Sequence, residues 1–361
     1  MNICLIGNGL TNLVLANILI KKKIKIDLYS TKKKLNITKN RTLGISQENI
    51  KFLKENGINL NNVIWPIKKI KIFNEKNLNN EILNFNNKNE DGFSIVRNHE
   101  LYKILKKKLK KNIFFSEKTI KNNSFYNSVI NNYDLIINSD LHNIISKKYF
   151  SKKIVKDYKS KSYITTITHK KCKNNIAIQI FTKFGPLAFL PINQNKTSIV
   201  FSVFKKNDLN DSKILNLIKK YNLNYKINKF ALFNSYELKL SLLKKYYKKN
   251  ILAFGDCLHK IHPFAGQGFN MSLRDINIFS KIVDERLKLG LALDSTIAET
   301  FEKEAKHFNF LFSNGIDFIH EFFKFDNKIK NNYSKKIFDF INKNKLLIKN
   351  IKNFANKGFI L

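Results

Sequence analysis

The chain has few residues of the kinds that cross-link, stiffen or bend a polypeptide. Its 361 residues include three cysteines, four prolines, twelve glycines and one tryptophan. The cysteines, Cys4, Cys172 and Cys257, have no paired spacing, which excludes a disulfide scaffold and favours a reducing compartment. No apolar run approaches the roughly twenty residues that a membrane-spanning helix needs. We therefore expect a cytoplasmic protein, or one held peripherally on the inner face of a membrane.

Arginine is scarce as well, although the formal net charge is +39. Proteins that read bases use bidentate arginine in localised patches, whereas the basic residues here are almost all lysines spread along the chain. This distribution argues against a nucleic-acid partner. Lysines near a surface of anionic lipids contribute about 1 kcal/mol each to binding, so an anionic membrane surface is an expected partner.

Three of the glycines fall in one stretch, GDCLHKIHPFAGQGFNMSLRD, from Gly255 to Asp275. An apolar run precedes this stretch and helical periodicity follows it, which predicts a strand, a loop and the start of a helix. Asp256 would accept hydrogen bonds from sugar or ribityl hydroxyls, and Gly266 and Gly268 would let backbone N–H groups approach a ligand. The helix start directs its positive dipole end at that ligand, so the segment predicts a site for a cofactor that carries negative charge.

A second glycine pair opens the chain. An apolar strand leads into G-N-G-L-T-N and an apolar helix, which is typical of a phosphate-binding turn. Gly7 would form the tight turn, and Gly9 would admit a pyrophosphate to the helix start. Asn12 replaces the third glycine of the dinucleotide fingerprint and is expected to loosen the packing of helix on strand. Ser30 replaces the acidic residue that holds a ribose.

The stretch from Gly255 to Asp275 resembles the signature of the flavin-dependent aromatic hydroxylases. It is most similar to the ubiquinone-biosynthesis branch, whose signature is close to G-D-A-A-H-x-x-x-P-x-x-G-Q-G-x-N-x-x-x-x-D. The matching residues are Gly255, Asp256, His259, Pro263, Gly266, Gln267, Gly268, Asn270 and Asp275. The resemblance implies that FAD is bound by Gly7, Gly9, Asp256, Gly266, Gln267, Gly268 and Asn270. It also implies that Pro263, the one catalytic residue we name, places a backbone carbonyl near the substrate hydroxyl.

Two other interpretations of this stretch are weaker. A glycine-rich turn that caps an ordinary helix explains Gly266 and Gly268, but not their spacing from Asp256. A metal site at His259 and His262 lacks a further ligand at a persuasive spacing, so we expect no metal.

Further matches to the hydroxylases follow in the family's order. Arg41, in R-T-L-G-I-S, matches an arginine that reaches the flavin region, with a solvated loop charge as the alternative. Asn98 matches a polar cofactor contact, with helix N-capping as the alternative. In DLIINSD the family's acidic residue survives as Asp140, whereas its second glycine is Leu141, which puts the flavin and nicotinamide contacts of that loop in doubt.

The segment F-T-K-F-G-P-L-A-F-L-P-I, residues 181–192, is similar to the F-x-x-x-G-P-L-A-x-L-P segment of the same family. Its apolar, proline-bounded character predicts a pocket wall in which Leu187 and Phe189 line the substrate site. A plain edge strand with a turn at Gly185 is the alternative.

The order of segments predicts an α/β protein in which a Rossmann-like FAD-binding domain is interleaved with a mixed β-sheet substrate domain. The FAD-binding domain would comprise residues 1–63, 97–155 and 250–300, and the substrate domain residues 64–96 and 156–249. Residues 301–361 would form a tail of C-terminal amphipathic helices, with apolar positions such as Phe338, Ile348 and Phe354 alternating with lysines. Such a tail packs on its own protein or contacts a membrane surface.

The resemblance implies an FAD-dependent monooxygenase that hydroxylates the ring of a polyprenylated phenol in ubiquinone biosynthesis. It would use NAD(P)H and O2 and act through a flavin hydroperoxide. The losses at Asn12, Ser30 and Leu141 leave one alternative from another class, a non-catalytic scaffold in a ubiquinone-biosynthesis assembly. An epoxidase or halogenase of the same fold is disfavoured by the segment 181–192.

Overall fold

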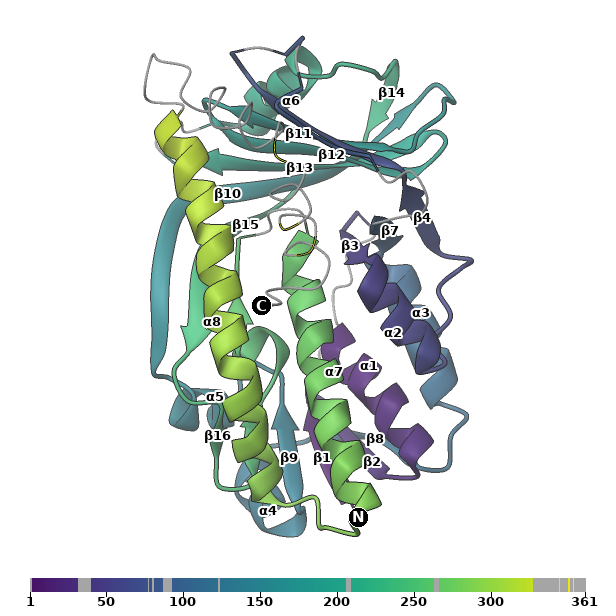
Figure 1. Ribbon diagram of the computed structural model, residues 1–361, viewed down its shortest axis with the longest axis vertical. Coiled ribbons are helices and arrows are strands. Elements are labelled where there is room, and N and C mark those ends of the chain that lie inside the picture. The colour runs from purple at the N-terminus through teal and green to yellow at the C-terminus, as the bar shows by residue number, and fades with distance from the viewer. Residues whose placement is uncertain are drawn as a thin grey trace.

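The computed structural model describes residues 2–31, 40–76, 78–79, 81–86, 93–122, 124–205, 209–262 and 266–326, together with Asn344, Asn350 and Asn353. Its described part forms two layers, each built on a large sheet, and α8 (Ser295–Asp326) runs alongside both (Figure 1). The α/β class predicted from the sequence is confirmed.

The first layer is a six-stranded sheet in the order β16-β17-β9-β1-β2-β8. Its strands are β1 (Asn2–Ile6), β2 (Lys25–Thr31), β8 (Phe115–Ile120), β9 (Leu135–Asn138), β16 (Tyr247–Lys248) and β17 (Ile251–Ala253). Strands β1, β2, β8, β9 and β17 pair in parallel, so helices must connect them. Because β17 pairs with β9, the distant segment near residue 250 belongs to the same sheet as the N-terminal strand.

Helices cover this sheet. They are α1 (Leu10–Leu19) with the short η1 (Ile20–Lys22), α2 (Gln47–Glu55), α3 (Asn98–Leu109), α4 (Phe125–Asn132), α5 (Ile144–Tyr149) and α7 (Gln267–Lys288). Helix α1 lies beside α3 and α7 and is buried from residue 12 to residue 19 (Figure 1). The first glycine turn, which is itself only partly buried, therefore lies at the end of a helix that has almost no solvent face.

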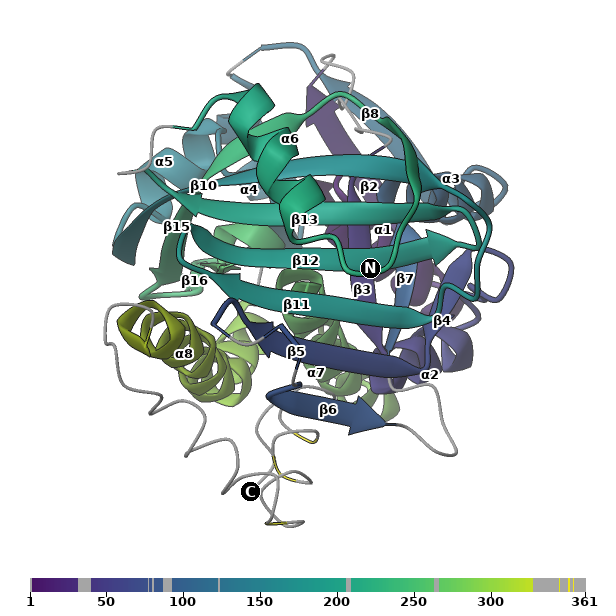
Figure 2. The same cartoon turned by 90° about the horizontal axis from the view of Figure 1, so that it is seen from above.

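The second layer is a nine-stranded sheet in the order β18-β15-β10-β13-β12-β11-β5-β6, with β14 paired to β10. Its strands are β5 (Lys69–Asn74), β6 (Leu83–Asn86), β10 (Lys153–His169), β11 (Ile176–Thr182), β12 (Gly185–Asn193), β13 (Lys196–Phe204), β14 (Ile227–Phe230), β15 (Asn234–Leu243) and β18 (His259–Lys260). Helix α6 (Asp211–Lys220) covers the outer face of this sheet (Figure 2). The inner face is turned toward α7 and the first layer.

A small sheet in the order β3-β7-β4 lies between the two layers. Its strands are β3 (Thr42–Ser46), β7 (Phe93–Arg97) and β4 (Ile64–Ile67). The range 64–96, predicted as part of the substrate sheet, is thus divided: β5 and β6 extend the nine-stranded sheet, whereas β4 and β7 pair with each other, and β7 also with β3.

Helix α8 packs an apolar side onto the rest of the molecule through Phe301, Phe312, Ile316 and Phe323. It begins six residues before the predicted tail. The amphipathic positions predicted beyond it, such as Phe338, lie outside the described residues. No helix in the described part of the chain has the length and apolar composition of a membrane-spanning segment.

Three lysines have the backbone conformation in which glycine is the usual residue. Lys23, Lys159 and Lys249 have φ angles of 57°, 47° and 52°, in the left-handed region. Lys23 and Lys249 lie in turns, whereas Lys159 lies in β10, where the register shifts between Asp157 and Ser160. Side chains with a Cβ are disfavoured in this conformation, so these positions are held by their surroundings rather than by local preference.

Candidate cofactor site

The turn between β1 and α1 has the shape of a phosphate-binding turn. Gly7 has φ 101°, and a Cβ at this position would lie 2.8 Å from Ser139 Oγ, so the turn accepts only glycine. Gly9 is the N-cap of α1, and, its chain neighbours apart, no atom in the described part of the chain lies within 4 Å of the position that its Cβ would take. The positive end of α1 therefore faces open space beside Gly9, as a pyrophosphate site requires.

Asn12 holds this turn closed. Its buried side chain donates hydrogen bonds to the carbonyl oxygens of Ile6 and Gly7, at 2.9 and 2.8 Å. The expected loosening of helix on strand is not found, because the amide fills the space that a glycine would leave and bonds to the strand end.

The two glycine segments meet at Gly255. This residue has φ 58°, and a Cβ on it would lie 3.0 Å from Thr11 Oγ1, in the first turn of α1. The neighbouring Asp256, in the single turn η3 (Gly255–Cys257), is exposed. The segment that carries the exposed Asp256 thus lies beside the first turn of α1, although almost 250 residues separate the two in the sequence.

The start of α7 is fixed to the small sheet. Gly266, the N-cap of α7, has φ 67°, and a Cβ on it would lie 3.0 Å from the backbone nitrogen of Gly44 in β3. The buried side chain of Asn270 donates to the Gly44 carbonyl oxygen at 2.9 Å. Its Oδ1 accepts from the Ser46 amide at 3.0 Å and from Asn49 Nδ2 at 2.9 Å. Asn270 is therefore a clamp that joins α7, β3 and α2.

The neighbours of that clamp leave room for a ligand. Gln267 is buried, and its Oε1 has no hydrogen-bond partner in the described part of the chain. Among the described residues, a Cβ on Gly268 would meet one atom, at 4.0 Å. An unsatisfied amide oxygen and an uncrowded glycine are the features expected beside a bound cofactor.

The backbones of Arg41 and Asn98 lie side by side, because the backbone N–H of Asn98 donates to the carbonyl oxygen of Arg41 at 3.0 Å. Asn98 is the first residue of α3, whose N-cap is Arg97 without a side-chain cap bond. The capping alternative for Asn98 therefore does not apply. Arg41 is exposed, just before β3, and the next residue, Thr42, donates to Ser198 Oγ of the nine-stranded sheet at 3.0 Å.

His259 and Asp275 form a buried pair. His259 Nε2 lies 2.5 Å from Asp275 Oδ2, and both side chains are almost fully buried. Asn309 of α8 donates to the second carboxylate oxygen at 2.9 Å. These two signature residues therefore join β18, α7 and α8 and do not face the glycine turns.

His262, three residues further on, lies among aromatic rings. Its ring centroid is 5.1 Å from that of Tyr158 and 4.5 Å from that of His320. Burial, and then the nearby His320, holds the pKa of His262 well below its usual value. Burial likewise lowers the pKa of His320, so both imidazoles are neutral near neutral pH.

The acidic residue of β2 is internal. Asp27 is 2% exposed and accepts hydrogen bonds from Ser116, Lys118 and Tyr133 at 2.5, 2.8 and 2.6 Å. Burial alone would raise the pKa of its carboxyl, but the bonds from Lys118, Ser116 and Tyr133 bring it below its usual value. Asp27 therefore does not supply the acidic contact that Ser30 lacks.

The predicted substrate residues lie elsewhere. Leu187 and Phe189 are buried on the outer face of β12, packed with Ile214 and Ile218 of α6. The structure does not bring them to the cofactor residues, because side chains alternate across a strand and their neighbours Ala188 and Leu190 take the inner face. Pro263 lies outside the described residues.

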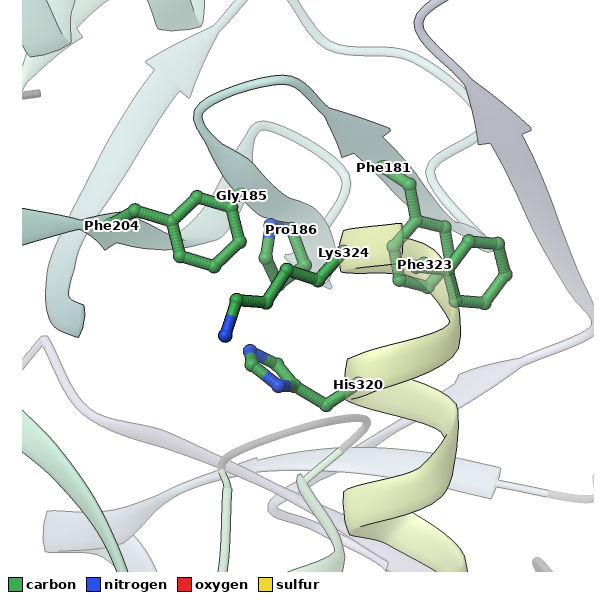
Figure 3. Close-up of a pocket in the computed structure, with 7 residues that line it drawn as sticks. All are labelled: Phe181, Gly185, Pro186, Phe204, His320, Phe323 and Lys324. Carbon is green, nitrogen blue, oxygen red and sulfur yellow. The ribbon is translucent and has the colours of Figure 1, made fainter. Parts of the chain in front are cut away.

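A small pocket opens between α8 and the inner face of the nine-stranded sheet (Figure 3). It is lined by Phe181, Gly185, Pro186, Phe204, His320, Phe323 and Lys324, none of which is a predicted cofactor residue. The site at the glycine turns is therefore recognised from its backbone geometry and not from this pocket.

Four residues of the site were not predicted: Thr11, Gly44, Ser46 and Asn49. Gly44 had a signal in the sequence, since it is the glycine of R-T-L-G-I-S. The structure gives the reason for that glycine, because a Cβ on it would lie 1.8 Å from the Phe93 ring. Thr11 lies within the first glycine segment. Ser46 and Asn49 carry no local signal, because their role depends on the distant Asn270.

No family model matches the chain. Among curated proteins it is 25% identical to the ubiquinone hydroxylase UbiL of Rhodospirillum rubrum over 37% of the chain, and 27% identical to the 3-demethoxyubiquinol 3-hydroxylase of Escherichia coli over 38%. The aligned regions span 33% and 37% of those two proteins, about a third of their length. It is 23% identical to the mitochondrial ubiquinone biosynthesis monooxygenase COQ6 of Dictyostelium discoideum, over 89% of the chain and 81% of that protein.

Solved structures agree on the fold. The p-nitrophenol 4-monooxygenase PnpA of Pseudomonas putida aligns with a TM-score of 0.78 and 10% identity, covering 99% of this chain and 98% of that one. The probable FAD-dependent monooxygenase PqsL of Pseudomonas aeruginosa aligns with a TM-score of 0.71 and 13% identity, covering 95% and 100%. The resemblance stated from the signature is confirmed.

Proposed function

We propose that this chain, a relative of the ubiquinone-biosynthesis hydroxylases with the fold of the FAD-dependent monooxygenases, is itself an FAD-dependent aromatic-ring hydroxylase. The observation that carries the proposal is the contact of Gly255 with Thr11, which joins the two glycine segments in one place. A scaffold without a ligand has no need for an open helix end at Gly9 with the Gly255 segment packed against the same helix turn.

The residues present fit FAD. The open N-terminus of α1 at Gly9 would hold the pyrophosphate, and Asp256 would accept from ribityl hydroxyls. The amides at the start of α7, from Gly266 to Gly268, would stabilise negative charge on the flavin ring. Arg41 and Asn98 would contact the cofactor from the side of the small sheet. Bound FAD would supply the redox chemistry, with NAD(P)H as reductant and O2 as oxidant.

The described side chains also suggest where the ring of a substrate would lie. Ile164, Val200 and Ala188 pair side by side on the inner face of the nine-stranded sheet. They belong to neither of the two apolar clusters that cover that face, one with Met271 of α7 and the other with Phe93 of β7. A phenolic ring would fit against these side chains, shielded from water by the clusters on either side, with the Pro263 carbonyl near its hydroxyl.

We further propose that the phenol is polyprenylated and belongs to ubiquinone biosynthesis. Support comes from the names of the three curated relatives, each of which refers to ubiquinone or ubiquinol. The lysine-rich surface would hold the protein peripherally on an anionic, cytoplasm-facing membrane where such a substrate resides. Membership of a biosynthetic assembly is part of the same proposal.

Purification tests the cofactor directly. We expect a yellow protein with a flavin absorption band. Asp256→Ala should bind FAD about ten- to a hundredfold more weakly, because the loss of charge-assisted hydrogen bonds costs about 1.5–3 kcal/mol. The same protein should oxidise NAD(P)H faster when a prenylated phenol in detergent is added. A colourless, stable wild type would favour the scaffold, and flavin binding without any phenol-stimulated oxidation would refute the hydroxylase.

A further inference from the structure

A second pocket lies at the far end of the nine-stranded sheet, beside β4. It has a volume of about 370 Å³ and is lined by Trp65, Lys171, Cys172, Lys173, Asn174, Asn175 and Gln194. These residues come from β4, from the loop between β10 and β11, and from the turn between β12 and β13. None of them has a part in the site described above.

The floor of this pocket is a built structure. The Trp65 indole N–H donates to the Asn174 carbonyl oxygen at 2.5 Å. The buried Asn174 side chain donates to the Asn193 carbonyl oxygen at 2.7 Å and accepts from the Tyr225 hydroxyl at 2.9 Å. The Cys172 amide donates to the Gln194 carbonyl oxygen at 3.0 Å. These bonds fix the loop and the turn against the indole ring before any ligand arrives.

The rim carries positive charge. Lys171 and Lys173 are exposed, no carboxylate of the described residues lines the pocket, and neither lysine forms an ion pair with the described acidic residues. Gln194 is exposed beside them and offers an amide. A flat ring, two cations and an amide around a cavity form a site for an anion that carries an aromatic ring, such as a nucleotide.

The position of the pocket relates it to the cofactor site. Trp65 and Gly44 both pair with Ile95, from opposite sides of β7. Trp65 is therefore two strands from Gly44, about 10 Å, since neighbouring strands lie about 4.8 Å apart. Gly44 in turn contacts Gly266 at the start of α7. A ligand long enough to fill the pocket and cross the small sheet would reach the flavin ring.

We propose that this pocket binds the phosphate and adenine end of the pyridine nucleotide whose nicotinamide reduces the flavin. The inference rests on the proposed function for the identity of the ligand, whereas the nucleotide chemistry of the pocket stands on its residues. Lys171 and Lys173 hold the phosphates, the Trp65 ring carries the base, and Gln194 contacts the sugar or base edge.

The pocket contains two reporters that make a direct binding test possible. Trp65 is the one tryptophan of the chain, and Cys172 is exposed whereas Cys4 and Cys257 are buried. The flavin-loaded protein is titrated with NADP+, which does not reduce a flavin, and with ADP and inorganic phosphate. The quenching of Trp65 fluorescence and the protection of Cys172 from iodoacetamide are followed.

We expect NADP+ to quench Trp65 fluorescence and to protect Cys172 at concentrations at least tenfold lower than those at which ADP or phosphate does so. The double variant Lys171→Glu with Lys173→Glu should weaken NADP+ binding at least tenfold. Lys213→Glu with Lys219→Glu, on exposed positions of α6, changes the net charge equally and should stay within twofold of the wild type. Trp65→Phe should abolish the fluorescence signal while Cys172 is still protected.

The two proposals fail differently. If phenol-stimulated NADPH oxidation is present but NADP+ neither quenches nor protects, the pocket assignment is overturned and the hydroxylase stands. Equal weakening in both double variants, or equal binding of phosphate and NADP+, shows general attraction of anions and also overturns the assignment. If NADP+ binds as expected but no phenol is oxidised, the nucleotide site stands and the hydroxylase does not.

Discussion

The two glycine segments of the cofactor site hold their shape in different ways. The first departs from the dinucleotide fingerprint at Asn12, yet the amide of that residue bonds to the strand end and keeps the turn closed. The second agrees with the hydroxylase signature at nine positions, but His259, Asn270 and Asp275 use their side chains for internal bonds. Agreement with a signature therefore reports on the framework of a site as much as on its ligand contacts.

A similar contrast exists inside the second segment. His259 and His262 are three residues apart and both are buried, but their surroundings are opposite. His259 lies against a carboxylate, whereas His262 lies among the rings of Tyr158 and His320. Proximity in sequence thus says little about what a histidine does.

The largest effect should come from breaking the framework of the second segment. Asp275→Ala removes the carboxylate that links His259 to Asn309 and should lower the free energy of unfolding by about 3–5 kcal/mol, as for other broken buried pairs. Urea unfolding of the flavin-free protein measures this. Asp284→Ala, on the same helix but half exposed beside Lys22, should cost no more than about 1 kcal/mol. Equal losses in the two variants would show that the buried pair has no special role.

A smaller effect should follow when the first segment is restored to the fingerprint. Asn12→Gly supplies the third glycine but removes two hydrogen bonds of about 1 kcal/mol each, and glycine is slightly less favourable than asparagine in a helix. We expect a loss of about 2–3 kcal/mol in urea unfolding. Asn12→Ala removes the same hydrogen bonds without introducing glycine, so the difference between the two variants measures the contribution of glycine to the loss. A neutral or stabilising Asn12→Gly would mean that the amide is dispensable.

The smallest effect should distinguish the two histidine environments through pH. The pKa values of His262 and His320 are lowered in the folded protein, so the unfolded chain binds protons more readily. Their contribution to stability is therefore present above about pH 6.5, the usual pKa of an unfolded histidine, and is lost as the pH falls below it. Unfolding curves at several pH values should show that His320→Phe has a flatter dependence than the wild type. His307→Phe, which replaces an exposed histidine on the same helix, is the matched control.

The sequence predicted the parts of the site that depend on local chemistry. Gly7, Gly9 and the stretch from Gly255 were recognisable because strained turns and helix starts require particular residues. The sequence did not predict that Leu187 and Phe189 lie on the outer face of β12. A strand that is apolar on both faces shows no alternation of apolar and polar residues, so its sequence does not indicate which side chains face the site. The pairing of β4 and β7 with β3 was missed because strand partners are set by tertiary packing.

The same limit explains the clamp and the buried pair. Asn270 was expected to touch the cofactor, but its partners Ser46 and Asn49 lie more than 220 residues away. Asn309, which completes the pair of His259 and Asp275, has no motif around it. Long-range polar partners of this kind become visible only when the chain is folded.

Lys23, Lys159 and Lys249 have left-handed backbone angles at positions where glycine would be free of strain. Each Cβ in that conformation costs roughly 1–2 kcal/mol relative to the ordinary right-handed one, and glycine would avoid the cost. This lysine-rich chain therefore carries the strain at two turns and at one irregularity of β10. Replacing these lysines by glycine is therefore a way to raise the free energy of unfolding without changing a residue of the candidate cofactor site.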